Sequence, residues 1–170
     1  MKKIGLIYSF NAKKSATVAK KIKDELADVE VEEINAEEIT GKQFLAHDNL
    51  ILGVPTWFDG ELPNYWDEFV PELEDLDLKG KKIAIYGLGD QVGYPENFVD
   101  AVGIMARLVT SQGAKVVGKT SVEGYSFEYS EAAEEDKFLG LAIDQENQAR
   151  ETKSRVRDWV KQLIKEFNLS

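Results

Sequence analysis

Short apolar runs alternate with amphipathic helical patterns along the whole chain, and this alternation limits the fold more than any other feature. Strand-like runs lie at residues 4–8, 29–32, 49–54, 83–88 and 115–118. Apolar residues at helical spacing follow from about Ser15, after Pro63, over Val102–Val109 and over Val156–Phe167. This order predicts an α/β fold in which helices cover both faces of a five-stranded parallel sheet.

The fifth predicted strand is interrupted. It starts at Lys115–Gly118, and Phe138–Ile143 is expected to resume it after a segment from about Ser121 to Lys137. That segment is too long for an ordinary connection, so we interpret it as an insertion. Its aromatic and acidic residues suit either a partner-facing or a structural role, and the sequence does not choose between them.

Length and composition predict one domain spanning residues 1–170, because 170 residues with 43% apolar content can bury a sizeable core. The absence of cysteine excludes disulfides, thiolate metal sites and thiol nucleophiles. No apolar run is long enough to span a membrane, and the first strand follows Met1-Lys2-Lys3 without a cleavage site. We therefore expect a cytoplasmic protein.

The charge of the chain indicates its partners. A net charge of −10 opposes both nucleic-acid phosphate and anionic membrane. From Gln43 to Leu78 there is no Lys or Arg, and this acidic stretch carries nine carboxylates: Asp48, Asp59, Glu61, Asp67, Glu68, Glu72, Glu74, Asp75 and Asp77. A solvated surface would explain the acidic stretch by itself. Because the acidic stretch includes the loop around Trp57, where a ligand could bind, we expect it to dock basic partner proteins.

Two aromatic residues follow neighbouring predicted strands directly. Trp57 lies in the loop after residues 49–54, and Tyr94 lies in the loop after residues 83–88. Ligands of parallel sheets bind at the carboxyl ends of the strands, where these two loops meet. An isolated ring at a strand end is more often a cap on the core, but two rings in matching loops can hold a planar ligand such as a flavin.

The two loops resemble those of long-chain flavodoxins. The first reads Thr56-Trp57 with Gly60-Glu61-Leu62, and the second reads Gly87-Leu88-Gly89-Asp90-Gln91-Val92-Gly93-Tyr94 with Asn97-Phe98-Val99-Asp100-Ala101. The interrupted fifth strand and the ending Gly140-Leu141-Ala142-Ile143-Asp144-Gln145-Glu146-Asn147-Gln148 also fit that subgroup. The resemblance covers essentially the whole chain and implies the sheet order 2-1-3-4-5.

This resemblance implies a monomeric one-electron carrier that binds FMN without a covalent bond, rather than an enzyme. Trp57 and Tyr94 would flank the isoalloxazine ring, and Asn97 would lie near the ribityl chain. Backbone groups of Leu88, Gly89 and Asp90 would face the pyrimidine edge. A flavodoxin reductase and an electron-accepting enzyme would be its basic redox partners.

The loop after the first strand departs from the family pattern. Relatives wrap the FMN phosphate with Thr, Ser and Gly, whereas this chain has Ser9-Phe10-Asn11-Ala12-Lys13-Lys14-Ser15. Two hydroxyl bonds to the phosphate would be missing, a loss of roughly 3 to 6 kcal/mol. The amides of the following helix and the two lysines can offset this loss, so we expect a more electrostatic phosphate site. Alternatively, both lysines are exposed loop residues.

The sequence also suggests how the one-electron steps are separated. Each acidic side chain about 10 Å from the flavin would disfavour the anionic hydroquinone by roughly 1.7 kcal/mol at an effective dielectric of 20. In the family, a backbone carbonyl at the position of the Phe58–Asp59 peptide turns to accept a bond from reduced flavin N5, which stabilises the semiquinone. We therefore predict a low-potential carrier that shuttles between semiquinone and hydroquinone.

Other interpretations remain open. A flavin-dependent NAD(P)H quinone or nitro reductase shares the fold, although Tyr94 would cover the face that hydride transfer needs. A binding module could have lost the cofactor through its altered first loop. Gly87, Gly89 and Gly93 match a dinucleotide fingerprint poorly. His47 stands without clustered ligands, which favours a solvated or locally hydrogen-bonded role, and we expect neither a metal site nor catalytic residues.

Overall fold

A parallel sheet forms the centre of the fold, and the computed structural model describes residues 3–169. Its strands are β1 (Lys3–Tyr8), β2 (Glu30–Asn35), β3 (Asn49–Gly53), β4 (Lys82–Leu88), β5 (Lys115–Val117) and β9 (Leu141–Ile143). Their order is β2-β1-β3-β4-β5, with β5 beside the first half of β4 and β9 beside its second half. The predicted α/β fold, strand order and interrupted fifth strand are confirmed.

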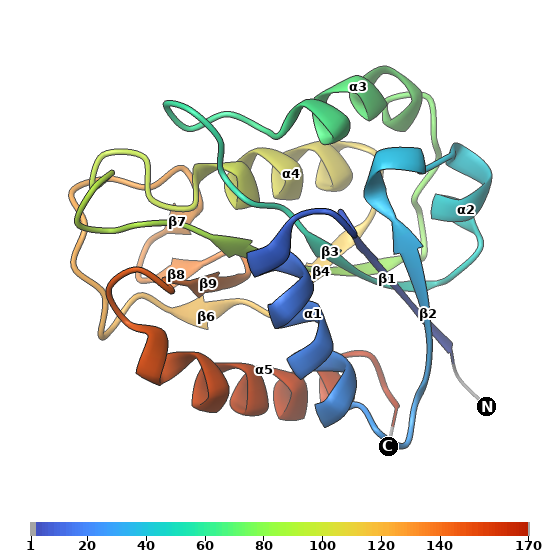
Figure 1. Ribbon diagram of the computed structural model, residues 1–170. Helices are drawn as coiled ribbons and strands as arrows, with labels where there is room; N and C mark the ends of the chain where they lie inside the picture. Colours follow the sequence, from blue (N-terminus) through green and yellow to red (C-terminus); the bar gives the residue numbers. More distant parts are fainter. Residues whose placement is uncertain (1–2, 170) are drawn as a thin grey trace.

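Helices cover both faces of this sheet (Figure 1). On one face lie α1 (Lys13–Glu25) and α5 (Thr152–Glu166), and on the other lie α3 (Asn64–Leu73) and α4 (Asp100–Ser111). Each helix buries one apolar stripe, such as Val156, Val160 and Leu163 of α5. Two apolar clusters therefore form the core, one on each side of the sheet.

Short elements that periodicity did not predict connect β2 to β3. They are the 3-10 turn η1 (Ala36–Glu38) and the helix α2 (Gly41–Leu45). Elsewhere in the chain, a second 3-10 turn, η2 (Ala149–Glu151), precedes α5. A capping box between Thr40 and Gln43 explains where α2 begins. His47 is buried after α2 with Nε2 2.7 Å from a Glu32 carboxylate oxygen, so of its two expected roles the structure shows the local hydrogen bond and not the solvated one.

The insertion forms a small antiparallel sheet of β6 (Thr120–Ser121), β8 (Lys137–Phe138) and β7 (Ala133–Glu134). The prediction that Phe138 resumes the fifth strand is therefore wrong, because Phe138 pairs with β6 and β7 while only Leu141–Ile143 returns to β4. Phe138 packs against Phe98, which anchors the insertion to the second loop. These contacts support the structural role for the insertion.

Several predicted boundaries of strands and helices also shift by a few residues. β2 begins at Glu30 and excludes Val29, whose amide instead bonds the Leu26 carbonyl at the end of α1. β5 ends at Val117, because Gly118 takes a left-handed conformation with φ of 78°. Helix α1 begins at Lys13 rather than near Ser15. This last shift places both lysines of the first loop in the first turn of the helix.

Gly103 offers a test of how the insertion packs on α4. A Cβ at Gly103 would overlap the backbone of Glu131 and Ala132. Alanine favours helices over glycine by about 1 kcal/mol, yet we expect Gly103→Ala to lower the free energy of unfolding by about 1 to 3 kcal/mol through overpacking. Urea unfolding measures the change, with Thr110→Ala on the exposed side of α4 as the control. Equal or greater stability of Gly103→Ala would contradict this packing.

Candidate functional site

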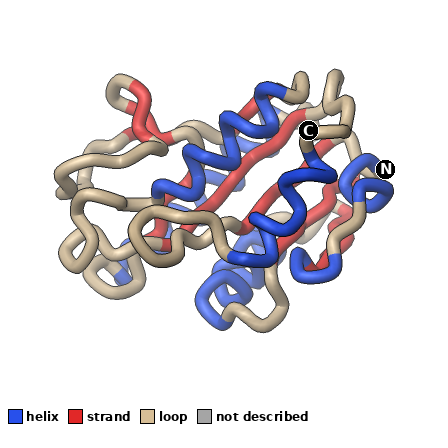
Figure 2. Tube along the Cα trace, turned by 90° about the horizontal axis from the view of Figure 1, so that it is seen from above, coloured by secondary structure: helices blue, strands red, loops and turns tan. Residues whose placement is uncertain are grey.

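Four loops meet at the carboxyl end of the sheet, where tan loops extend from one end of the strands (Figure 2). They follow β1, β3, β4 and β9. A cleft of about 500 Å³ lies among them, and it adjoins a hollow of about 300 Å³. The predicted site residues that line one or both are Ala12, Lys13, Lys14, Ser15, Thr56, Trp57, Phe58, Leu88, Gly89, Asp90, Tyr94 and Asn97. Ser9, Phe10, Asn11 and Asp59 lie outside this lining.

The loop after β3 presents Trp57 to the cleft. Trp57 and Glu61 exchange two backbone hydrogen bonds of 2.9 and 2.8 Å, which closes the loop into a tight turn. The turn requires positive φ at Gly60 and also at Phe58, a non-glycine residue whose φ is 51°. The Phe58 side chain is 70% exposed at the tip. The backbone that carries the Trp57 ring is therefore held by the turn, while the Phe58 side chain projects into solvent.

The loop after β4 is shaped by Asp90. Its Oδ1 accepts bonds from the Gly93 amide at 2.7 Å and the Val92 amide at 3.1 Å. These two backbone donors and the Asn147 side-chain amide, with Gly93 contributing most, lower the pKa of Asp90 below its usual range. The fold thus holds an ionised carboxylate at the cleft edge. Tyr94, 56% exposed, follows this turn and faces the same cleft as Trp57.

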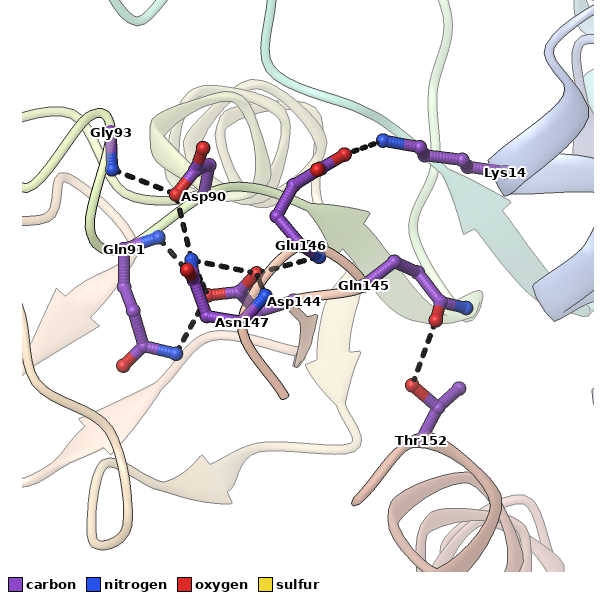
Figure 3. Close-up of polar contacts among 9 residues, drawn as sticks. All are labelled: Lys14, Asp90, Gln91, Gly93, Asp144, Gln145, Glu146, Asn147 and Thr152. Carbon is purple, nitrogen blue, oxygen red and sulfur yellow. Dashed lines mark hydrogen bonds and ion pairs between the residues drawn. The ribbon is translucent and has the colours of Figure 1, made fainter. Parts of the chain in front are cut away.

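A buried carboxylate joins this loop to the turn after β9 (Figure 3). Asp144 accepts bonds from the Gln91 backbone amide at 3.1 Å and from its side-chain amide at 2.7 Å. It also accepts from the amides of Glu146 and Asn147 at 3.1 and 3.0 Å. Charged acceptors make stronger hydrogen bonds than neutral ones. Asp144 therefore fixes two walls of the cleft relative to one another.

The first loop leads into an uncapped helix. Ala12 occupies the N-cap position of α1 without a side-chain hydrogen bond, so the first amides of the helix lack a side-chain acceptor. Around it, Asn11 donates to the Glu37 carboxylate at 2.7 Å, and Ser15 is buried while its carbonyl accepts from the Tyr86 hydroxyl at 2.9 Å. Lys14 forms an ion pair with Glu146 across the cleft (Figure 3). Among residues 3–169, Lys13 forms no ion pair, so its charge is the more available of the two.

Asp100 and Thr56 connect the start of α4 to the Trp57 loop. The Thr56 hydroxyl accepts from the Ala101 amide at 3.0 Å. The Asn97 side-chain amide donates to the Asp59 carbonyl and to an Asp100 carboxylate oxygen, both at 3.2 Å. Burial raises the pKa of Asp100, against the opposing effect of the Glu131 amide and Asn97. Asn97 and Asp59 are therefore held together even though Asp59 does not line the cleft.

Known proteins resemble this chain in sequence and fold. The model of the flavodoxin family matches residues 6–159. The chain belongs to the flavodoxin family. A flavodoxin from a Nostoc species is 42% identical over 170 residues, covering 99% of each chain, and one from Synechococcus elongatus is 41% identical, covering 99% of this chain and all of the relative. The crystal structure of Fusobacterium nucleatum flavodoxin bound to flavin mononucleotide is similar with a TM-score of 0.93, 34% identity, and coverage of 98% of this chain and 99% of the other.

Sequence reasoning missed several residues that build the flavodoxin cleft. Gln91 donates to Asp144, Asn147 donates to Asp90, and Asp100 accepts from Asn97. In the sequence, only their position near strand ends hinted at these roles. No group of metal-binding side chains lies within residues 3–169. In the same part of the chain, no helix is long and apolar enough to cross a membrane.

The contribution of the Asp144 hydrogen bonds to the stability of the protein can be measured. Asp144→Asn keeps the side-chain shape but replaces one acceptor oxygen by a donor that faces several other donors. We expect the free energy of unfolding to fall by about 2 to 3 kcal/mol. Chemical unfolding monitored by tryptophan fluorescence measures it. Asp158→Asn, at a carboxylate 71% exposed on α5, is the matched control and should change stability little. An effect of equal size in both variants would contradict the network.

Proposed function

We propose that this flavodoxin binds FMN in the cleft and carries single electrons between proteins. The observation that carries the proposal is that Trp57 and Tyr94, from neighbouring strands, line one cleft beside an uncapped helix N-terminus. When bound, FMN supplies two one-electron steps, and we assign the working couple to semiquinone and hydroquinone. The cleft fits this cofactor chemically, because it combines aromatic walls for a planar ring with free amides for a phosphate.

Each site residue would contact one part of FMN. Trp57 and Tyr94 would flank the ring, and backbone groups of Leu88, Gly89 and Asp90 would bind its pyrimidine edge. Asn97 and Thr56 would lie along the ribityl chain, where Asn97 already holds the Asp59 carbonyl. The loop of Ser9 to Ser15 would surround the phosphate.

The phosphate site would depend on amides and charge rather than on loop hydroxyls. Phe10 and Ala12 cannot donate a side-chain hydrogen bond, whereas the first amides of α1 carry the positive end of the helix dipole. Lys13 lines the cleft directly. Lys14 also lines it, but its pairing with Glu146 competes with any bound anion. Lys13 would therefore contribute more than Lys14.

A salt series tests this phosphate site. Lys13→Ala/Lys14→Ala should weaken FMN binding about tenfold at low salt, because two partly exposed charges are lost. Riboflavin, which lacks the phosphate, should bind the variant and the wild type alike, and rising salt should shrink the difference for FMN. Quenching of flavin fluorescence measures all four affinities. FMN affinity that neither the substitution nor salt changes would show that the lysines are bystanders.

Surrounding charge would disfavour full reduction of the cofactor. The acidic stretch from Gln43 to Leu78 includes Asp59, next to the cleft, and Asp90 is held ionised at its edge. Each carboxylate about 10 Å away opposes a new negative charge by about 1.7 kcal/mol at an effective dielectric of 20. The Phe58–Asp59 peptide would supply the acceptor for a protonated ring nitrogen. Asn97 binds the carbonyl of the next peptide, Asp59–Gly60, and this bond opposes free movement of the segment.

The same negative charge supports basic proteins as the partners. Basic redox proteins, a reductase that loads the electron and an enzyme that accepts it, would be steered to the acidic surface. Tyr94 and the exposed Phe58 lie at the edge of the cleft, so a docked partner would approach the cofactor there. We propose that the carrier acts as a monomer.

The carrier proposal has a direct test. The purified protein, supplied with FMN, should be yellow and should turn blue on partial reduction with dithionite, because a one-electron state accumulates. It should oxidise NADH or NADPH slowly or not at all when quinone is the acceptor, since Tyr94 would cover one ring face. Rapid turnover would favour the quinone or nitro reductase. A protein that fails to quench FMN fluorescence at micromolar concentration would favour the flavin-free module.

A further inference from the structure

The loop after β3 is held at both of its ends by the segment that starts α4. At the start of the loop, the Thr56 hydroxyl accepts from the Ala101 amide at 3.0 Å. Near its tip, the Asp59 carbonyl accepts from the Asn97 side-chain amide at 3.2 Å, and the same nitrogen donates to Asp100 Oδ2, also at 3.2 Å. The beginning of α4 therefore controls where this loop can move.

The Asp100 carboxylate fixes the Asn97 side chain. Asp100 is 3% exposed, and both of its oxygens accept hydrogen bonds: Oδ2 from Asn97, and Oδ1 from the Glu131 amide of the insertion at 2.8 Å. A Cβ at Gly60 would overlap Asp100 Oδ2 and press on Asn97 Nδ2. The backbone of the loop thus packs directly onto the Asn97–Asp100 pair, and solvent cannot easily replace either partner.

Strained backbone flanks this contact on both sides. Phe58, one residue before Asp59, has a φ of 51°, and Val99, one residue before Asp100, has a φ of 46°. A left-handed conformation is rare for bulky and β-branched residues. Such strain persists only where surrounding contacts hold it, and it is concentrated at functional sites. Breaking the contact therefore frees two segments that are both held away from their preferred geometry.

The bond to Asn97 also limits the neighbouring peptide. The Phe58–Asp59 peptide and the Asp59–Gly60 peptide share the Asp59 Cα atom. Turning the first peptide changes φ of Asp59, which displaces the Asp59 carbonyl unless the rest of the loop compensates. Because Asn97 holds that carbonyl, it resists the turn.

From these contacts we infer that Asp100 is a positioning residue for electron transfer: through Asn97 it holds the Asp59 carbonyl, and it thereby sets how readily the Phe58–Asp59 peptide turns to accept a hydrogen bond from the flavin ring. The inference rests on the proposed FMN binding. Asn97 lines the cleft, whereas Asp100 does not and acts from behind it. Through the Glu131 amide, the insertion contributes to the same control.

The two one-electron steps distinguish this role from a simple effect of charge. In the first step an electron and a proton are added, and the ring stays neutral. In the second step an electron alone is added, and the ring becomes anionic. The turned peptide accepts from the nitrogen that carries the added proton, so the loop acts on the first step. Loss of a nearby carboxylate acts mainly on the second step, where charge develops.

Asp100→Asn tests the inference, because the amide has one acceptor oxygen for two donors and so releases Asn97. Dithionite titration of the FMN-loaded protein gives both potentials. The first should rise by about 59 mV, which is a tenfold gain in the neutral one-electron state and matches the loss of one hydrogen bond. Glu96→Gln is the matched control, since it removes an exposed carboxylate one residue before Asn97. The control should leave the first potential unchanged.

Two further measurements show whether Asp100 acts through Asn97. In an Asn97→Ala background, Asp100→Asn should cause no additional shift of the first potential, because the contact is already absent. In the cofactor-free protein, the Trp57 amide, bonded to the Glu61 carbonyl at 2.9 Å, reports how firmly the loop is closed. Its hydrogen exchange should be severalfold faster in Asp100→Asn than in wild type or Glu96→Gln.

Four results would overturn the inference while leaving FMN binding intact. They are an unchanged first potential in Asp100→Asn, equal shifts in Asp100→Asn and Glu96→Gln, additive shifts when Asp100→Asn is combined with Asn97→Ala, and unchanged exchange of the Trp57 amide. If Asp100→Asn does not fold, Asn97→Ala breaks the same contact from the other side, and an unchanged first potential there overturns the inference. Failure of the wild type to bind FMN would instead remove the proposed function itself.

Discussion

The site depends on how β3 and β4 pair at their carboxyl ends. Gly53 lies opposite Tyr86 in this register, and a Cβ at Gly53 would collide with the Tyr86 ring and hydroxyl. Because Gly53 leaves that space, Tyr86 can cross under the strand end and bind the first turn of α1. The Gly53 carbonyl also accepts the Trp66 indole, which positions α3. One small residue thus brings three elements of the cleft together.

Carboxylates that accept hydrogen bonds from backbone amides hold the loops in place at the paired ends of β3 and β4. Asp144 is fully buried, and the donors that face it belong to two different loops. Asp100 is nearly as buried and accepts from Glu131 of the insertion at 2.8 Å as well as from Asn97. An ionised group tolerates such burial only when donors surround it. The insertion therefore reaches the Trp57 loop through Asp100, which gives it a structural connection to the cleft.

Periodicity predicted most of the fold, because each long helix and each central strand buries an apolar face of regular spacing. It could not predict α2 or the small sheet of the insertion, since five residues or fewer hold too few repeats. Trp57 and Tyr94 were identifiable from strand ends, and the structure brings them to one cleft. Gln91 was not, because its role depends on the buried Asp144, which lies in a different loop far along the chain.

The proposed complex would place an anion in a protein whose net charge is −10, so long-range electrostatics oppose binding. Short-range donors must outweigh that opposition. The first amides of α1 and Lys13 would lie on the phosphate side, whereas Asp90 at the cleft edge, and Asp59 outside its lining, would lie on the ring side. Charge is thereby divided along the length of the cleft: donors would secure the phosphate, and carboxylates would resist added electrons at the ring. Tight binding and strong reducing power then need not compete, because different residues control each.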